Sequence, residues 1–258
     1  MPREPETMSR PSLLVRTAIV FCALGAPLHL SAQSRYGGDG FLYGRPSVSV
    51  TVRGGLAQPT AKSDIFAFSR KNLTLSQSDY LSGSWGVDVG VRLANKLELQ
   101  LGVAYSSRSA DSEFRDWVDN EKKPIEQSTT FRRTPMTVGL KYYLTSPGRS
   151  LGKLAWVPSK VTPYVAAGGG VVSYLYQQSG DFVDFKTLDV FSSTLSSRAT
   201  TATGFAALGV GYSLSSSFSL VTEARYDSAR GRTTRDFQGF SRIDLSGVAM
   251  TAGLNVRF

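Results

Sequence analysis

Charged residues recur within segments that otherwise alternate between apolar and small or polar side chains. Alternate residues of a β-strand point to opposite faces, so these charges are expected on the face that the apolar residues avoid. If the strands close into a small barrel, opposite charges inside it must pair, because unpaired buried charge is costly. Two interpretations stay open: a salt-bridged plug that stabilises the barrel, and a gated or selective pore. The residues of this predicted interior network are Arg53, Asp88, Arg92, Glu98, Lys141, Glu223 and Arg225.

Catalytic chemistry is limited by residues that most of the chain lacks. The single histidine, His29, and the single cysteine, Cys22, both lie within the first 32 residues. Beyond them no Ser–His or Cys–His nucleophile and no Cys/His zinc site can be assembled. We therefore predict a protein that is not an enzyme and that needs no cofactor and no metal.

Two other groups could in principle bind ligands. The run from Gly168 to Gly170 lacks the spacing of a phosphate-binding loop, and glycine within a strand more often permits bending or close packing. An acidic cluster is interleaved with basic residues and lacks the ligand spacing of a calcium loop, so we interpret it as a solvated loop. This cluster consists of Asp111, Glu113, Asp116, Asp119 and Glu121.

The first residues have the order of a secretory signal peptide. Three basic residues, Arg3, Arg10 and Arg16, precede an apolar run over 18–28, and the run is followed by Ser31, Ala32, Gln33 and Ser34, as at a cleavage site. The run is shorter than the ~20 residues that a spanning helix needs. These features predict a cleaved signal peptide over 1–32, a short lead segment over 33–45 and one domain over 46–258. Removing the signal lowers the net charge from +9 only to about +8.

Alternation with a period of two predicts eight strands in the remaining chain. The segment 163–176 is rich in glycine and its facing is ambiguous; we expect Tyr164, Val172 and Tyr174 to face outward. The expected strands cover approximately 48–53, 85–93, 97–105, 136–144, 163–176, 208–214, 218–226 and 248–258.

The connections between these strands alternate in length. Short turns near Asn95 and 215–217 contrast with long polar segments over 58–81, 107–128, 177–198 and 228–242. This asymmetry is typical of outer-membrane barrels, which have short periplasmic turns and long extracellular loops. The segment 145–160 is long although it falls on the short side, and we expect only an extended periplasmic turn there.

Aromatic residues gather near both ends of the expected strands. Two such belts are typical of membrane barrels, because amphipathic rings settle at the level of the lipid headgroups. A soluble barrel or sandwich would show the same alternation, but neither the belts nor the asymmetry of the loops. The sequence therefore favours an all-β, eight-stranded, antiparallel up-and-down transmembrane barrel in the bacterial outer membrane.

The chain resembles the small outer-membrane β-barrel family of OmpA- and OmpX-like eight-stranded barrels over nearly all of 45–258. The resemblance is carried by Thr134–Leu144 (TPMTVGLKYYL), Thr162–Val172 (TPYVAAGGGVV) and the alternating end at Phe258. In that family a terminal aromatic belongs to the signal read by the outer-membrane assembly machinery. The resemblance implies that Leu254, Val256 and Phe258 form this signal here.

Function is less constrained than architecture, since this fold does not fix an activity. We expect a structural or surface-interaction role, such as adhesion, with a small pore or transporter for an unknown solute as the alternative. The net positive charge of a chain that is exported indicates outer-membrane lipid or lipopolysaccharide as partners rather than nucleic acid. Loop residues could bind an extracellular ligand: Phe182, Phe185, Phe191, Arg230, Arg232, Arg235 and Arg242.

Overall fold

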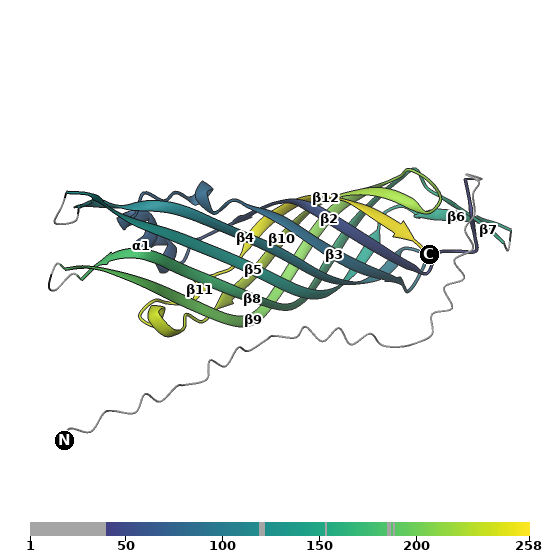
Figure 1. The fold of residues 1–258 in the computed structure, drawn as a ribbon. Coiled ribbons are helices and arrows are strands. Elements are labelled where there is room, and N and C mark those ends of the chain that lie inside the picture. Colours follow the sequence, from purple (N-terminus) through teal and green to yellow (C-terminus); the bar gives the residue numbers. More distant parts are fainter. Residues whose placement is uncertain (1–39, 119–121, 153, 185–186, 188) are drawn as a thin grey trace, which may run out of the picture. The chain divides into compact units, whose positions relative to one another are not determined.

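The computed structural model describes residues 40–118, 122–152, 154–184, 187 and 189–258. The predicted signal peptide, most of the lead segment, and Asp119, Glu121 and Phe185 lie outside the described residues. Eight antiparallel strands form a closed ring (Figure 1). They are β2 (Val48–Pro59), β3 (Ser82–Arg92), β4 (Leu97–Val118), β5 (Pro124–Tyr143), β8 (Val161–Val183), β9 (Val190–Ser213), β10 (Phe218–Gly231) and β12 (Gly247–Arg257).

The ring closes because every strand has two neighbours. β12 pairs with β2 on one side and β10 on the other, and β10 also pairs with β9. The β12–β2 pairing joins the last strand of the ring to the first, and all other neighbours in the ring follow one another along the chain. The predicted up-and-down barrel of eight strands is therefore confirmed.

The two faces of the sheet have opposite character. Leu101 and Val138 face outward with 48% and 47% of their surface exposed, whereas Arg53 and Asp88 keep only 7% and 3%. A soluble barrel would bury its apolar face and expose its charges, which is the reverse of what is observed. An apolar exterior around a polar interior is instead the pattern of a transmembrane β-barrel.

Aromatic residues ring both ends of this apolar exterior. Trp85 and Tyr226 are exposed at one level, and Tyr142, Tyr212 and Phe218 at the other. Trp85 also packs against Tyr105 on the neighbouring strand, with ring centroids 5.6 Å apart. These belts set the height of the barrel in the bilayer.

The facing predicted for the glycine-rich strand is wrong. Tyr164, Val172 and Tyr174 are buried inside the barrel, and Val165 and Val171 face outward instead. The two tyrosines find polar partners inside: the Tyr164 hydroxyl donates to Glu223, and that of Tyr174 donates to the carbonyl of Arg232. A tyrosine hydroxyl is favoured where it finds such a partner, and at mid-height the lipid-facing side of a barrel offers none.

Two segments expected as loops are mainly strand. β4 and β5 pair continuously from Ser106 opposite Arg133 up to Glu113 opposite Glu126, and β8 pairs with β9 as far as Val183 opposite Val190. The segments 107–128 and 177–198 therefore continue the sheet beyond the membrane. The other long connections hold short elements: α1 (Asp64–Asn72), η1 (Gln77–Tyr80), η2 (Arg235–Phe237) and β11 (Ile243–Asp244).

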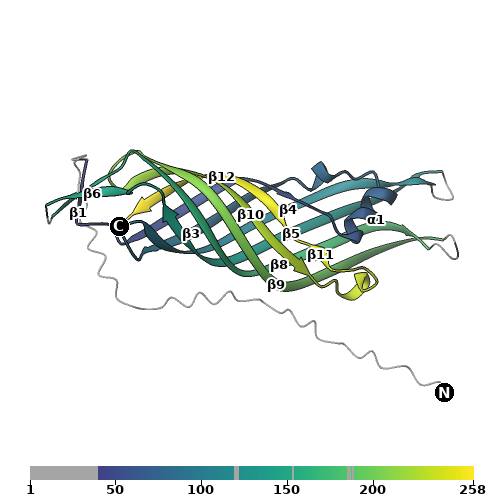
Figure 2. The ribbon, with the colours of Figure 1, turned by 180° about the vertical axis from the view of Figure 1, so that it is seen from behind.

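The segment 145–160 contains a hairpin rather than an irregular turn. β6 (Gly148–Leu151) pairs with β7 (Ala155–Pro158), and β7 pairs with β1 (Leu42–Tyr43). We call this three-stranded sheet the periplasmic lid. Figures 1 and 2 show β6 and α1 at opposite ends of the barrel. Across the described residues, no helix combines the length and apolarity that a membrane crossing requires.

Candidate functional site in the barrel lumen

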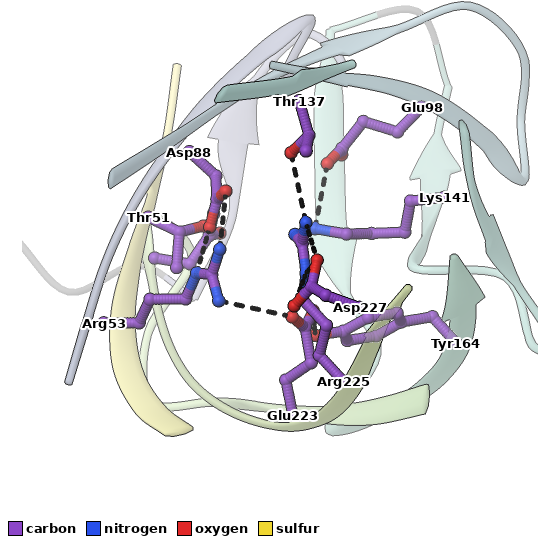
Figure 3. A network of polar contacts seen from close by, with 11 residues as sticks. Thr51, Arg53, Asp88, Glu98, Thr137, Lys141, Tyr164, Glu223, Arg225 and Asp227 are labelled. Carbon is purple, nitrogen blue, oxygen red and sulfur yellow. Dashed lines mark hydrogen bonds and ion pairs between the residues drawn. The ribbon is translucent and has the colours of Figure 1, made fainter. Parts of the chain in front are cut away.

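The centre of the lumen is occupied by an ion-pair cluster from β2, β3, β8 and β10. The Arg53 Nε donates to Asp88 Oδ2 at 2.6 Å and its Nη2 donates to Oδ1 at 3.2 Å, a bidentate arrangement. Arg53 also lies 3.6 Å from Glu223, whose second oxygen accepts the Tyr164 hydroxyl at 2.8 Å. One guanidinium therefore links two carboxylates (Figure 3).

A second cluster lies next to the first. The Lys141 ammonium is 3.3 Å from Glu98 Oε1, and the Tyr143 hydroxyl donates to Glu98 Oε2 at 3.0 Å. The same ammonium lies 4.9 Å from the centre of the Tyr164 ring. Tyr164 thus contacts both clusters, so the two act as one continuous packed network.

Arg225 has a partner that the sequence did not indicate. It pairs with Asp227, two residues further along the same face of β10, at 2.9 Å, and also donates to Thr137 across the lumen. Its guanidinium carbon lies 3.8 Å from the centre of the Phe205 ring. Asp227 lies one residue beyond the strand 218–226 that the alternation predicts, whereas β10 continues to Gly231.

Inward-facing glycines make room for these large side chains. A Cβ at Gly139 would lie 2.6 Å from the Phe205 ring, and one at Gly168 would lie 2.8 Å from it. Gly102 and Gly209 similarly face Asp88 and the Tyr164 ring. The glycine-rich strand is therefore explained by close packing inside the barrel, as anticipated for Gly168.

Arg92 lies near the periplasmic lid and, among the described residues, forms no ion pair with the other members of the predicted network. The guanidinium groups of Arg92 and Arg257 each lie 5.9 Å from the ring of Trp156. Trp156 belongs to β7, is 2% exposed, and packs over Gly148 of β6. The periplasmic lid thus inserts an indole ring against two cations at the mouth of the barrel, a favourable cation–π geometry.

The extracellular end is blocked by apolar packing. Phe66 of α1 makes edge-to-face contacts with Tyr80, Phe131 and Tyr176, at centroid distances of 5.1–5.5 Å. Tyr176 in turn packs against Phe237 of η2 at 5.4 Å. We call this assembly of α1, η1 and η2 on the inner walls of the strands the extracellular cap. It belongs to one cluster that includes Ile65, Leu73, Leu75, Ile125, Ile243 and Leu245.

Little free space remains between the two closures. A hollow beside Arg53, Arg133 and Arg225 has a volume of about 40 Å³, and another beside Arg92, Lys141 and Arg257 about 20 Å³. Such volumes hold about one to three water molecules. The lumen is thus filled by side chains, as expected for a barrel of eight strands.

The charged side chains of the predicted interior network form two groups of ion pairs and one further pair. The structure brings together Arg53, Asp88 and Glu223, and separately Glu98 and Lys141, while Arg225 pairs outside both groups. Within the part of the chain that the structure describes, no three His, Cys, Asp or Glu side chains converge as metal ligands would. Asp111 and Glu113 are exposed on the outer face of β4. Sequence reasoning missed Tyr143, Tyr164, Asp227 and Trp156.

A closed antiparallel ring with an apolar exterior, aromatic belts and a charged interior defines an integral β-barrel protein of the bacterial outer membrane. Solved structures with a similar fold include OprG from Pseudomonas aeruginosa (14% identity, covering 84% of this chain and 99% of that chain, TM-score 0.44). Neisserial surface protein A is 15% identical, with 86% of this chain and 100% of that chain covered and a TM-score of 0.43. The outer-membrane protease OmpT of Escherichia coli is 10% identical, with 83% of this chain and 94% of that chain covered and a TM-score of 0.38. Neither a family model nor a curated protein sequence matches the chain.

Removing one member of the central ion pair should destabilise the barrel strongly. Arg53→Met or Asp88→Leu alone leaves a buried charge without its main partner, which costs about 3–5 kcal/mol. The double variant removes this pair and should recover part of that loss, because Glu223 still lacks its contact with Arg53. Urea-induced unfolding in lipid vesicles measures all three variants against the wild type. Additive losses in the double variant would contradict the pairing.

Proposed function

We propose that this protein is a closed, non-catalytic barrel that acts through the surface its strands raise above the outer membrane. The observation that carries the proposal is the contrast between the two parts of the sheet. Inside the membrane the barrel is filled and blocked at both ends, whereas β4, β5, β8 and β9 continue outward as a four-stranded sheet. A surface-interaction role would use this extension above the membrane. A transport role would need an open path through the interior of the barrel.

The extracellular cap makes the extension rigid. α1 lies against its inner side, where the Ser69 hydroxyl contacts that of Tyr176 at 2.8 Å. The edge of β4 is tied down as well, since Thr74 and Glu113 exchange hydrogen bonds of 2.9 Å. A rigid surface loses little conformational entropy on binding, which favours recognition.

The outer face of the extension is rich in hydroxyl groups. Ser109 contacts both Ser128 and Thr130 at 3.0 Å, and Ser173 contacts Thr200 at 2.7 Å. At the end of the β8–β9 hairpin, Phe182 and Phe191 stack with their centroids 6.0 Å apart, and Phe191 is 47% exposed. Exposed aromatics at the tip of a polar, rigid sheet are typical of a binding surface.

Replacing both aromatics at this tip should weaken surface binding without affecting the barrel. Cells that display the Phe182→Ser/Phe191→Ser variant should adhere to cultured cell monolayers several-fold less than cells that display the wild type. Leu151→Ser, which removes an exposed apolar side chain from the periplasmic lid, is the matched control and should leave adherence unchanged. Equal adherence of all three at equal surface levels would refute the role of the tip.

The transporter alternative predicts a measurable current. Because the lumen is packed and both ends are closed, the purified barrel should give no steady conducting steps in planar lipid bilayers at neutral pH. Trp156→Ala, which opens the periplasmic lid, should still conduct poorly, because the ion-pair clusters remain. Reproducible steps from the wild-type protein would overturn the closed-barrel proposal.

We further propose that Leu254, Val256 and Phe258 serve as the signal for assembly. Phe258 is 56% exposed and Leu254 is 44% exposed, so both project toward lipid rather than into the lumen. The backbone of Phe258 exchanges hydrogen bonds with Val48, at 2.9 and 3.3 Å, where the ring closes. A side chain that contributes no internal packing is available to an assembly factor until insertion is complete.

Phe258→Ala should therefore lower the yield of inserted barrel several-fold while leaving the refolded barrel stable. Phe218→Ala is the matched control, since Phe218 is a lipid-facing aromatic of the same belt with 44% exposure. The fraction that migrates differently when unheated and boiled measures insertion in cells, and urea unfolding of refolded protein measures stability. Equal losses of yield in both variants would show that Phe258 acts only as a belt residue.

A further inference from the structure

A polar groove lies at the extracellular rim of the barrel, beside β10 and β11. It encloses about 620 Å³ and is lined by three basic side chains, Lys62, Arg230 and Arg242, together with Tyr226 and several serines. None of the three cations has an ion-pair or side-chain hydrogen-bond partner among the described residues, whereas the basic residues of the lumen centre are paired. The three cations outnumber the two carboxylates that line the groove, Asp64 and Asp244, so the groove keeps an excess of one positive charge.

The two carboxylates of the groove are already engaged. Asp244 accepts hydrogen bonds from the Thr60 hydroxyl and from the backbone N–H groups of Lys62 and Ser246. Burial alone would raise the pKa of Asp244, but these hydrogen bonds hold it below its ordinary value, so the group stays ionised. Asp64 accepts from the N–H groups of Ser241 and Ile65. Both carboxylates fix the backbone of the rim, and the cations stay available.

An apolar groove begins where the polar groove ends. It encloses about 460 Å³ on the lipid-facing side, and Tyr226 lines both grooves. Small side chains form its floor: Ala206 lies opposite Tyr226, and Ala224 lies opposite Leu208 in the β9–β10 ladder. Leu208, Val165 and Val248 form its walls. A channel of this kind on a membrane-facing surface fits a hydrocarbon chain.

The backbone of Arg230 lies just above the headgroup layer, within reach of its phosphates for a long side chain. Arg230 lies four residues beyond Tyr226 on the same face of β10, about 13 Å along the strand at roughly 3.3 Å per residue. A tilt of about 40° reduces this to about 10 Å along the membrane normal. The polar layer of a bilayer is about 5–8 Å thick, and arginine side chains bend toward it from either side.

We propose that the two grooves together bind one phosphorylated glycolipid of the outer leaflet. Its phosphates lie among Lys62, Arg230 and Arg242, and one acyl chain follows the channel over Ala206 and Ala224. Two observations that are independent of each other support this occupant: three cations without ion-pair partners in the polar groove, and an apolar groove that shares Tyr226 with it. A free anion would use only the first, and a second copy of the chain would have to place negative charge against the rim.

Native mass spectrometry of the full-length barrel in a neutral detergent, with bisphosphorylated lipid A as the probe, tests the proposal. The wild type should retain one lipid A per barrel. The triple variant Lys62→Gln/Arg230→Gln/Arg242→Gln should bind it at least ten-fold more weakly. The matched control Lys71→Gln/Arg149→Gln/Arg198→Gln removes three exposed charges elsewhere and should stay within about two-fold of the wild type. Heat-modified migration on gels checks that each variant is folded.

A second variant tests the contact with the acyl chain separately from the contact with the phosphorylated headgroup. Ala206→Leu/Ala224→Leu fills the apolar channel and should weaken lipid A binding several-fold with the cations intact. If this variant binds like the wild type and inorganic phosphate displaces the lipid, the groove is a free-anion site and the proposal is wrong. Equal retention by the wild type and the triple cation variant also overturns it. Dimers that disappear in the triple variant, without bound lipid, would assign the groove to a second copy of the chain.

Discussion

Closure of the backbone hydrogen-bond ladder is the constraint on which the rest of the structure depends. In a bilayer each strand must satisfy its peptide groups through neighbouring strands, and only a closed ring leaves no edge. The contact of β12 with both β2 and β10 completes this ring. With eight strands the interior is narrow, so side chains rather than water occupy it. Residues on the exterior then contact lipid, and residues in the interior contact one another. Because successive residues of a strand alternate between these two faces, apolar and polar side chains alternate along each strand.

The crowded interior accounts for the pairing of charge with glycine. Glu98 lies where a side chain at Gly90 would stand, and Asp88 occupies the space beside Gly102. These two carboxylates therefore take up space that a side chain on the adjacent strand would otherwise fill. Breaking a pair leaves a charge that can neither move into solvent nor be covered by a neighbour. The same charged residues thus stabilise the barrel and fill its lumen.

Much of this organisation could be predicted from the sequence. Regular alternation in β2, β3 and β4 located the strands and the inward parity of Arg53, Asp88 and Glu98, since period two has a direct geometric meaning. It failed for β8, where glycine and alanine weaken the contrast between faces and two tyrosines suggested the lipid side. It also ended strands too early, because above the membrane both faces are polar or packed against α1, and lipid no longer imposes alternation.

Other features depended on contacts between distant segments. Asp227 falls one residue beyond the predicted strand 218–226, and only the continuation of β10 above Tyr226 places it beside Arg225. The role of Trp156 follows only from the folding of 145–160 back onto the mouth, where Arg92 and Arg257 arrive from strands far apart in sequence. A single sequence lists the residues of such a cluster, but it does not show that the fold brings them together.

The insertion of Trp156 into the periplasmic mouth has a consequence for the exchange of the lumen with its surroundings. The indole ring and the extracellular cap separate the ion-pair clusters from both compartments. Solvent then reaches Arg53 and Lys141 only when the periplasmic lid or the cap opens locally, so the exchange rate of lumen protons reports the free energy of that opening. The lumen is therefore a compartment closed at both ends by different interactions. The periplasmic lid is held by contacts between an indole ring and two cations, and the extracellular cap is held by a hydrophobic core.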